Sequence, residues 1–136
     1  MFSIGQLSKR TGVKIPTIRY YEQMGLIDAP ERSEGNQRRY TKDGLSRLSF
    51  IRHSRDLGFS VENIRGLLEL SQHPEKPCDD AHSIAVLHLK DVQDRIAKLK
   101  RLEQELKRIS ACDAGNVAHC SVIETLADHG LCETEH

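Results

Sequence analysis

The chain has 136 residues and a mass of 15.4 kDa, the size of one domain or of a small domain with an appendage. Its 20 Lys and Arg residues balance its 20 Asp and Glu residues. Residues 1–60, however, hold 11 basic and 6 acidic residues, whereas residues 61–136 hold 9 and 14. This asymmetry predicts a nucleic-acid-binding end and a different task at the other end.

Composition also excludes several classes of protein. No apolar run approaches the ~18 residues that a membrane span needs, and the first ten residues lack the apolar stretch of a signal peptide. We therefore expect a cytoplasmic protein. In that reducing compartment, the four cysteines favour metal ligation or thiol reactivity over a disulfide framework. No phosphate-binding loop and no nucleophile–base pair stands out, so we expect no enzyme.

Two short helices open the chain. Apolar spacing predicts the first over roughly residues 4–11, and Gly12 suits the tight turn after it. Pro16 suits the first position of a second helix over residues 16–24, and Gly25 suits its C-terminal end. Two short helices joined by a glycine-containing turn predict a helix-turn-helix.

Residues 26–40 carry turn chemistry and predict a small β-hairpin, with Gly35-Asn36 near its tip and residues 37–40 as its second limb. Thr41 is expected to cap a helix that runs to about Leu57, and Ser60 to cap the next one. The side chains expected to face inward from these two helices are Leu45, Leu48, Phe50, Ile51, Ile64, Leu67 and Leu68.

A breaker segment over residues 73–77 precedes a long helical pattern from about Asp79 to Ala111. Such a helix is ~50 Å long, and an apolar seam of 3-4-3 spacing follows it from Leu89 to Ile109. A seam of this length on a small protein predicts a coiled-coil homodimer. The alternative is that the seam packs against the N-terminal helices of its own chain.

The helix-turn-helix and the hairpin carry groups suited to DNA. Arg19 can clamp a phosphate or read a guanine edge, and tyrosine hydroxyls can bind phosphate oxygens. Arginines on the hairpin add a second grip on the duplex. The alternative is an ordinary charged surface, with the tyrosines in the core. The predicted DNA-contacting residues are Lys14, Thr17, Arg19, Tyr20, Arg32, Arg38 and Tyr40.

The order and spacing of several motifs resemble a known family. They are Ile4-Gly5-Gln6-Leu7, Thr17-Ile18-Arg19-Tyr20-Tyr21-Glu22, Gly25-Leu26, Arg38-x-Tyr40, Leu48-x-Phe50-Ile51 and Leu57-Gly58-Phe59-Ser60. Residues 1–70 resemble the DNA-binding half of MerR-family transcription regulators. The resemblance implies a winged helix-turn-helix and an antiparallel dimer bound to palindromic promoter DNA. It also implies an effector that makes the dimer distort the DNA, so that RNA polymerase can engage the promoter.

The cysteine positions predict a metal site. Cys112 and Cys120 flank the seven-residue segment DAGNVAH, which can fold back as a loop so that both thiolates meet one ion. Cys78 lies 34 residues before Cys112, ~51 Å away along a helix, so one chain cannot bring all three together. If two copies pair antiparallel, Cys78 of one copy approaches the loop of the other. His119 is a fourth candidate ligand, which would complete a tetrahedral set suited to zinc.

The family resemblance also bears on the identity of the metal. Its divalent sensors for zinc, cadmium, lead or mercury characteristically carry a cysteine at the start of the dimer helix, and its copper sensors lack one. Cys78 therefore places this chain beside the sensors of divalent zinc, cadmium or lead ions. The loop length is also familiar from the copper branch, so Cu(I) or Ag(I) is one alternative. A thiol-redox sensor is another, and a role for His129, Cys132 and His136 in metal binding stays open.

Together these patterns predict a mainly α protein, a winged helix-turn-helix followed by a long antiparallel coiled-coil dimerisation helix. We expect a DNA-binding domain over residues 1–72 and a hinge with the dimerisation helix over residues 73–111. Residues 112–136 are expected to form a metal-binding loop, a short helix over residues 121–128 with Ser121 as its candidate cap, and a tail.

Overall fold

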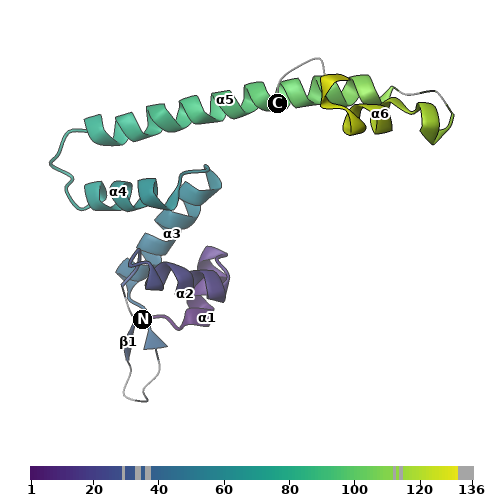
Figure 1. The fold of residues 1–136 in the computed structure, drawn as a ribbon. Coiled ribbons are helices and arrows are strands. Elements are labelled where there is room, and N and C mark those ends of the chain that lie inside the picture. Colours follow the sequence, from purple (N-terminus) through teal and green to yellow (C-terminus); the bar gives the residue numbers. More distant parts are fainter. Residues whose placement is uncertain (29, 33–34, 36–37, 112, 114, 132–136) are drawn as a thin grey trace. The chain divides into compact units, whose positions relative to one another are not determined.

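The computed structural model describes residues 1–28, 30–32, 35, 38–111, 113 and 115–131, with residues 31, 32 and 38 described by their backbone alone. These residues form two compact units, Met1–His82 and Ser83–His136 (Figure 1). The structure is mainly helical, as the sequence predicts. Among the described residues, no helix combines the length and the apolarity that crossing a membrane requires.

The predicted helix-turn-helix is confirmed at the start of the first unit. Helix α1 spans Ile4–Thr11 and begins with a capping box, in which the Ser3 hydroxyl accepts from the Gln6 N–H at 3.2 Å and the Gln6 side chain accepts from the Ser3 N–H at 2.8 Å. Gly12 ends the helix in the left-handed region, at φ 75°, which glycine adopts without steric cost. Helix α2 then spans Ile15–Gln23.

The predicted hairpin is also present. Strand β1 (Glu31–Arg32) pairs antiparallel with β2 (Arg38–Arg39), and Arg32 lies opposite Arg38. Asn36 of the predicted tip lies outside the described residues. The backbone of Tyr40 continues the ladder by pairing with Phe2, through N–H···O=C bonds of 2.7 and 2.8 Å. Phe2, the residue just before the α1 cap, is thereby joined to the end of this hairpin, which we call the wing (β1, β2 and the residues between them).

Two further helices complete the first unit, and both begin at the predicted caps. Helix α3 spans Lys42–Asp56 after the N-cap Thr41, and α4 spans Val61–Ser71 after the N-cap Ser60. The expectation that Phe50 faces inward is wrong, because this side chain is 37% exposed. Phe50 follows the buried Leu48 by two residues, about 200° around the helix, so the two side chains cannot share a face.

The core of the first unit draws on α1, α2, α3 and α4. Side chains of α2 and Tyr40 at the end of the wing pack into this same core. Each fully buried aliphatic side chain in it stabilises the fold by roughly 1.5–3 kcal/mol through removal from water. The largest fully buried side chains are Leu7, Ile18, Leu26, Leu48, Ile51 and Ile64.

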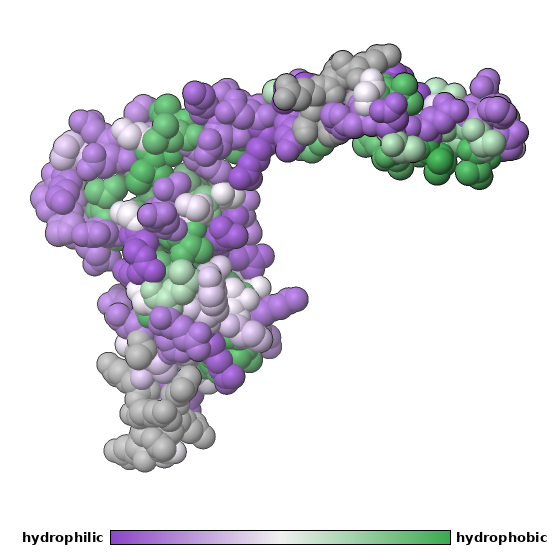
Figure 2. Space-filling view, viewed as in Figure 1, coloured by the Kyte–Doolittle hydropathy of each residue, from purple (hydrophilic) through white to green (hydrophobic). Residues whose placement is uncertain are grey.

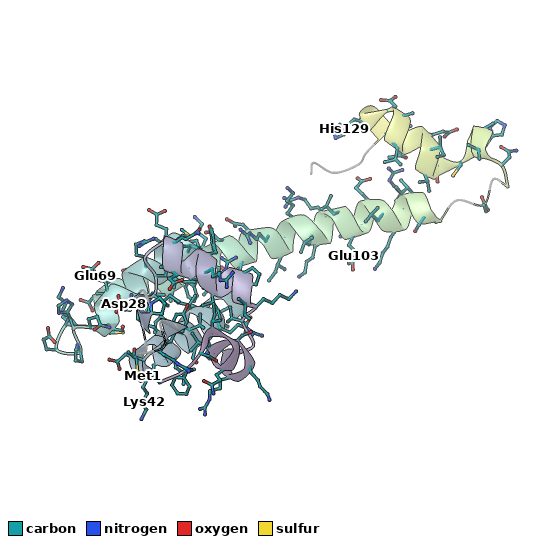
Figure 3. All side chains as sticks on the ribbon, turned by 90° about the horizontal axis from the view of Figure 1, so that it is seen from below. Met1, Asp28, Lys42, Glu69, Glu103 and His129 are labelled. Carbon is teal, nitrogen blue, oxygen red and sulfur yellow. The ribbon has the colours of Figure 1, made fainter. Side chains whose placement is uncertain are left out.

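The second unit is built on the long helix α5, which spans Asp79–Ser110 and begins in the first unit. A short 3₁₀ turn, η1 (Val117–His119), leads into α6 (Ser121–Ala127), and η2 (His129–Leu131) follows. Figure 3 shows α6 running alongside the C-terminal part of α5.

Apolar side chains gather on the surface where α6 lies along α5 (Figure 2). Some are covered there, as Ile109 is, while others remain open to solvent. The same exposure continues along α5 toward its N-terminus. The exposed apolar residues of α5 and α6 are Val86, Leu87, Leu89, Ile96, Leu99, Leu106, Ile123 and Leu126.

Candidate functional site

The outer face of α2 carries most of the side chains predicted to contact DNA from this helix. Arg19 and Tyr20 are exposed, Tyr20 by 51%, whereas the neighbouring Tyr21 is buried. Thr17 is half-buried, and Lys14 is exposed at the N-cap position. The helix therefore offers solvent a polar face with a cation at its start, which is how a recognition helix meets base edges and phosphates.

The wing brings its predicted arginines into register at one place. Arg32 and Arg38 are paired residues of the ladder, and both are described by their backbone alone. Arg39, between Arg38 and Tyr40, has a half-buried side chain. The hairpin thus places basic residues of both strands directly opposite each other.

Tyr40 is a correction to the predicted DNA-contacting set. Its side chain is 2% exposed and belongs to the hydrophobic core. Its hydroxyl lies 3.4 Å from a carboxylate oxygen of Glu22 on α2, to which it donates a hydrogen bond. Tyr40 therefore joins the wing base to α2 and is withdrawn from the residues that we assign to DNA contact.

Two arginines that the sequence analysis did not single out bind the backbone at and just after the C-terminal end of α2. Arg47 Nε on α3 donates to the carbonyl of Leu26 at 2.9 Å, and Arg65 Nη2 on α4 donates to the carbonyl of Met24 at 2.7 Å. Carbonyls at a helix end lack intrahelical partners, so the Arg65 bond satisfies the C-cap carbonyl of α2, and the Arg47 bond holds the segment that follows it. The partners lie 21 and 41 residues apart, and no local pattern marks them.

The described candidate ligands lie at the two ends of α5. Cys78 immediately precedes the helix in the first unit, its thiol is exposed, and its carbonyl accepts the N–H of His82 at 2.8 Å. Cys120 lies in the second unit and is half-buried. Cys112, the third predicted thiol, lies outside the described residues.

The segment before Cys120 is ordered by a side-chain cap. The Asn116 side-chain oxygen accepts the N–H of His119 at 3.1 Å, and the Cys120 N–H donates to the carbonyl of Val117 at 3.3 Å. These bonds close the turn η1 and set the chain direction into Cys120. The His119 side chain is exposed, so solvent can reach this candidate ligand.

The start of α6 differs from the expectation. Ser121 does not cap the helix; Cys120 holds the N-cap position and Ser121 is the first helical residue. The Ser121 hydroxyl instead donates to the carbonyl of Ile109 on α5 at 2.9 Å. The bond crosses from one helix to the other.

The other end of α6 is tied to α5 by Arg108. Its Nη2 atom donates both to a carboxylate oxygen of Glu105, at 3.0 Å, and to the carbonyl of Leu131 in η2, at 2.9 Å. Glu105 is buried, and beside it lies an apolar cavity of about 250 Å³ between α5 and the segment from α6 to η2. Its lining residues are Leu102, Glu105, Leu106, Ile109, Thr125, Leu126 and His129.

The donor set suits a thiophilic ion, because three of the predicted ligands are thiols. Cys78 precedes α5 in the sequence, and Cys112 and Cys120 follow it. Within the part of the chain that the structure describes, no three His, Cys, Asp or Glu side chains gather closely enough to hold a metal ion. Of the tail candidates, Cys132 and His136 lie outside the described residues, and His129 lines the cavity beside α6.

A polar recognition helix, a wing beside it and a second helical unit with thiols define a helix-turn-helix regulatory protein. Comparison with known proteins agrees. The model of the MerR HTH family of regulatory proteins matches residues 2–71, and a second model, described as MerR, DNA binding, matches residues 45–109. The transcriptional regulator ZntR of Escherichia coli K12 is 42% identical over 130 residues, which cover 93% of this chain and 92% of ZntR.

Solved structures are also similar to this chain. The transcription regulator PbrR691 from Ralstonia metallidurans CH34, in complex with lead(II), has a TM-score of 0.79 at 36% identity, covering 93% of this chain and 99% of that one. HiNmlR, a MerR-family regulator bound to promoter DNA, has a TM-score of 0.60 at 25% identity, covering 81% and 83%.

The chain therefore belongs to the MerR family of helix-turn-helix transcription regulators. The resemblance found in the motifs of residues 1–70 is confirmed. The expectation that the protein is not an enzyme is confirmed as well, because these relatives are transcription regulators.

Proposed function

We propose that this protein is a metal-responsive transcription activator, which senses a divalent thiophilic ion and switches on a promoter for metal efflux or resistance. It acts as an antiparallel homodimer in the cytoplasm. The observation that carries the proposal is a long helix with an open apolar seam, which the exposed Cys78 precedes and the half-buried Cys120 follows. The lead(II) complex of PbrR691 supports the metal response.

The open seam of α5 supports the dimer. Leu89, Ile96, Leu99 and Leu106 are all about half exposed or more in the single chain. Aliphatic residues repeating along 32 helical residues, about 48 Å, are costly to leave in water, and a second copy of the helix offers a matching seam.

The separation of the thiols supports a site shared between two copies. Cys78 and Cys120 belong to different units of one chain, at opposite ends of α5. Antiparallel pairing brings the start of one α5 beside the end of the other. We assign Cys78 of one copy and Cys112 with Cys120 of the other as ligands, with His119 as the fourth candidate.

The donor set favours a divalent ion. Three thiolates balance the charge of Zn²⁺, Cd²⁺ or Pb²⁺ better than that of Cu⁺, and a three-sulfur site suits the softer ions. Addition of His119 would favour zinc, which prefers four ligands in a tetrahedron. Bound metal would tie the two copies together and so bias the shape of the dimer.

The DNA-binding unit would carry that bias to the promoter. We assign Lys14, Arg19 and Tyr20 on α2, with the half-buried Thr17, to one groove, and Arg32 and Arg38 on the wing to the adjacent backbone. Deforming a promoter costs a few kcal/mol, so metal binding must favour the activating dimer by a comparable energy. RNA polymerase would then engage the distorted promoter.

An anaerobic competition titration tests the proposal. The reduced full chain is offered Zn²⁺, Cd²⁺, Pb²⁺ and Cu⁺ against calibrated chelators, with thiolate absorption as the signal. Cys78→Ser is compared with Cys132→Ser, which removes a thiol of the tail. We expect tight divalent binding that collapses in Cys78→Ser and persists in Cys132→Ser.

Mixed dimers test the sharing of the site. A Cys78→Ser chain and a Cys112→Ser/Cys120→Ser chain each lack a complete site, and a mixed dimer regains one. We expect the purified mixed dimer to bind half as much metal as the wild-type dimer, because one of its two sites is complete, and an equal, randomly paired mixture to bind about a quarter. Tight Cu⁺ binding that ignores Cys78 would instead place the protein among copper sensors. Absence of tight binding by any ion would favour a thiol-redox sensor.

A further inference from the structure

The two candidate thiols of the second unit lie in the sequence between Ile109 and Ser121, two residues that a side-chain hydrogen bond joins. Ile109 precedes Cys112 by three residues, and Ser121 directly follows Cys120. The hydrogen bond from the Ser121 hydroxyl to the Ile109 carbonyl, at 2.9 Å, joins the two ends of this segment. Both thiols therefore belong to a loop whose ends are held together.

The carbonyl that accepts this bond is one that the helix itself leaves without a partner. α5 ends at Ser110, so Ile109 is among the last four residues, whose carbonyls have no N–H donor farther along the helix. Ile109 is also buried, at 6% exposure, where an unpaired carbonyl is costly. Bonding to Ser121 is thus favoured over an open segment.

The chain on the other side of Cys120 is restrained as well. Asn116 closes the turn η1 by accepting the His119 N–H, and the Cys120 N–H donates back into that turn. Cys120 is therefore held before and after its own position, with η1 on one side and Ser121 on the other. Restraint of this kind lowers the entropy that a loop loses when its ligands gather at an ion.

We propose that Ser121 is a positioning residue for metal binding, because its hydroxyl holds the adjacent Cys120 beside the end of α5 before any ion arrives. The inference rests on the proposed function, since it concerns the same ligands. Ser121 itself touches no metal; it acts through the placement of its neighbour.

The chain offers a matched control for this hydroxyl. Ser110, at the end of the same helix, donates to the carbonyl of Lys107 at 3.1 Å. Removal of the Ser110 hydroxyl deletes a serine–carbonyl bond from the same region without opening the loop. Ser121→Ala is therefore compared with Ser110→Ala, and Ser121→Thr restores the hydroxyl.

The first readout uses the metal-free full chain. A short pulse of iodoacetamide, followed by peptide mass spectrometry, measures the alkylation rate of each cysteine separately. In Ser121→Ala we expect Cys120 to react about fivefold faster, the factor that one neutral hydrogen bond contributes to an opening equilibrium. Cys78 is the internal reference, and its rate should not change. Ser110→Ala and Ser121→Thr should stay within about twofold of the wild type.

The second readout is the Cd²⁺ affinity of the reduced protein, followed by thiolate-to-metal absorption. We expect Ser121→Ala to bind about fivefold more weakly with unchanged stoichiometry. If Ser121→Ala matches Ser110→Ala in both readouts while the wild type binds Cd²⁺ tightly, the positioning role is overturned and the proposed function stands. If the wild type binds none of the metals, the proposed function fails and this role fails with it.

Discussion

The guanidinium group of Arg52 on α3 donates from Nη1 to the carbonyl of Thr11 at 3.0 Å, across the turn of the helix-turn-helix. A Cβ atom at Gly12 would lie 2.5 Å from that same nitrogen. Gly12 therefore serves the turn twice, since it adopts a positive φ and leaves room for the arginine that holds the end of α1. The bond joins the end of α1 to α3, at the turn that leads into α2.

Gly12→Ala should destabilise the protein by about 1–3 kcal/mol, because alanine is strained at positive φ and displaces Arg52. Urea unfolding followed by circular dichroism measures the change. Gly5→Ala is the control, since a Cβ there meets nothing closer than 3.9 Å within a helix. In a double-mutant cycle with Arg52→Ala, the combined loss of stability should be smaller than the sum of the two single losses, and strict additivity would contradict the account.

Substitution of Tyr20 and of Tyr40, the two tyrosines predicted to contact DNA, should have different effects on stability and on DNA binding. Tyr40→Ala should cost about 3–5 kcal/mol of stability, the range for a buried aromatic side chain. Tyr20→Ala should change stability by less than about 0.5 kcal/mol and weaken DNA binding, because the side chain is exposed on α2. Thermal unfolding and promoter binding by fluorescence anisotropy measure the two effects. Equal stability losses in both variants would refute this distinction.

Arg19→Ala should weaken binding to any duplex if the guanidinium contacts phosphate, and lower the slope of log affinity against log salt by about one. If Arg19 reads a base edge, the loss should instead be confined to the specific promoter. Titrations at several salt concentrations on promoter and scrambled DNA separate the two cases. Lys100→Ala, which removes an exposed cation of α5, should leave both curves unchanged.

The buried carboxylate of α5 depends on its arginine. Arg108→Ala should destabilise the protein by about 1–3 kcal/mol, because Glu105 then loses a charged partner and Leu131 a donor. Lys107→Ala should cost less than about 0.5 kcal/mol, since its pair with Glu103 is exposed. The double variant Glu105→Leu/Arg108→Leu should regain stability in urea unfolding; a further loss would indicate that the pair is more than a compensated charge.

The helices of the first unit could be predicted from local signals. Thr41 and Ser60 lie at the N-caps that their spacing indicated, and Gly12 and Gly25 have the positive φ expected after a helix. These signals act within a few residues, where sequence order and spatial order agree. The wing could be predicted from local signals as well, because turn residues separate its two strands.

The errors arose where the deciding contact is distant in sequence. Tyr40 is buried because its backbone pairs with Phe2 and its hydroxyl meets Glu22 on α2, and neither partner is visible from the motif Arg38-x-Tyr40. The sequence predicted Ser121 as a helix cap, but its hydroxyl donates a hydrogen bond to the carbonyl of Ile109, 12 residues earlier. Hydrogen bonds between elements depend on the finished packing, which spacing within one element does not determine.

The pairing of Phe2 with Tyr40 has a consequence for how the protein can move on DNA. Those two backbone bonds join the wing to Phe2, the residue just before the Ser3 cap of α1, so the end of the wing cannot leave the start of the helix-turn-helix unless both break. The wing is therefore tied to the segment before α1 by these two bonds and to α2 by the Tyr40–Glu22 hydrogen bond. In a dimer, the spacing between the two DNA-binding surfaces would change only when whole first units move. An N-terminal tag without a spacer would disturb the Phe2–Tyr40 pairing, and so the wing, before it affected the second unit.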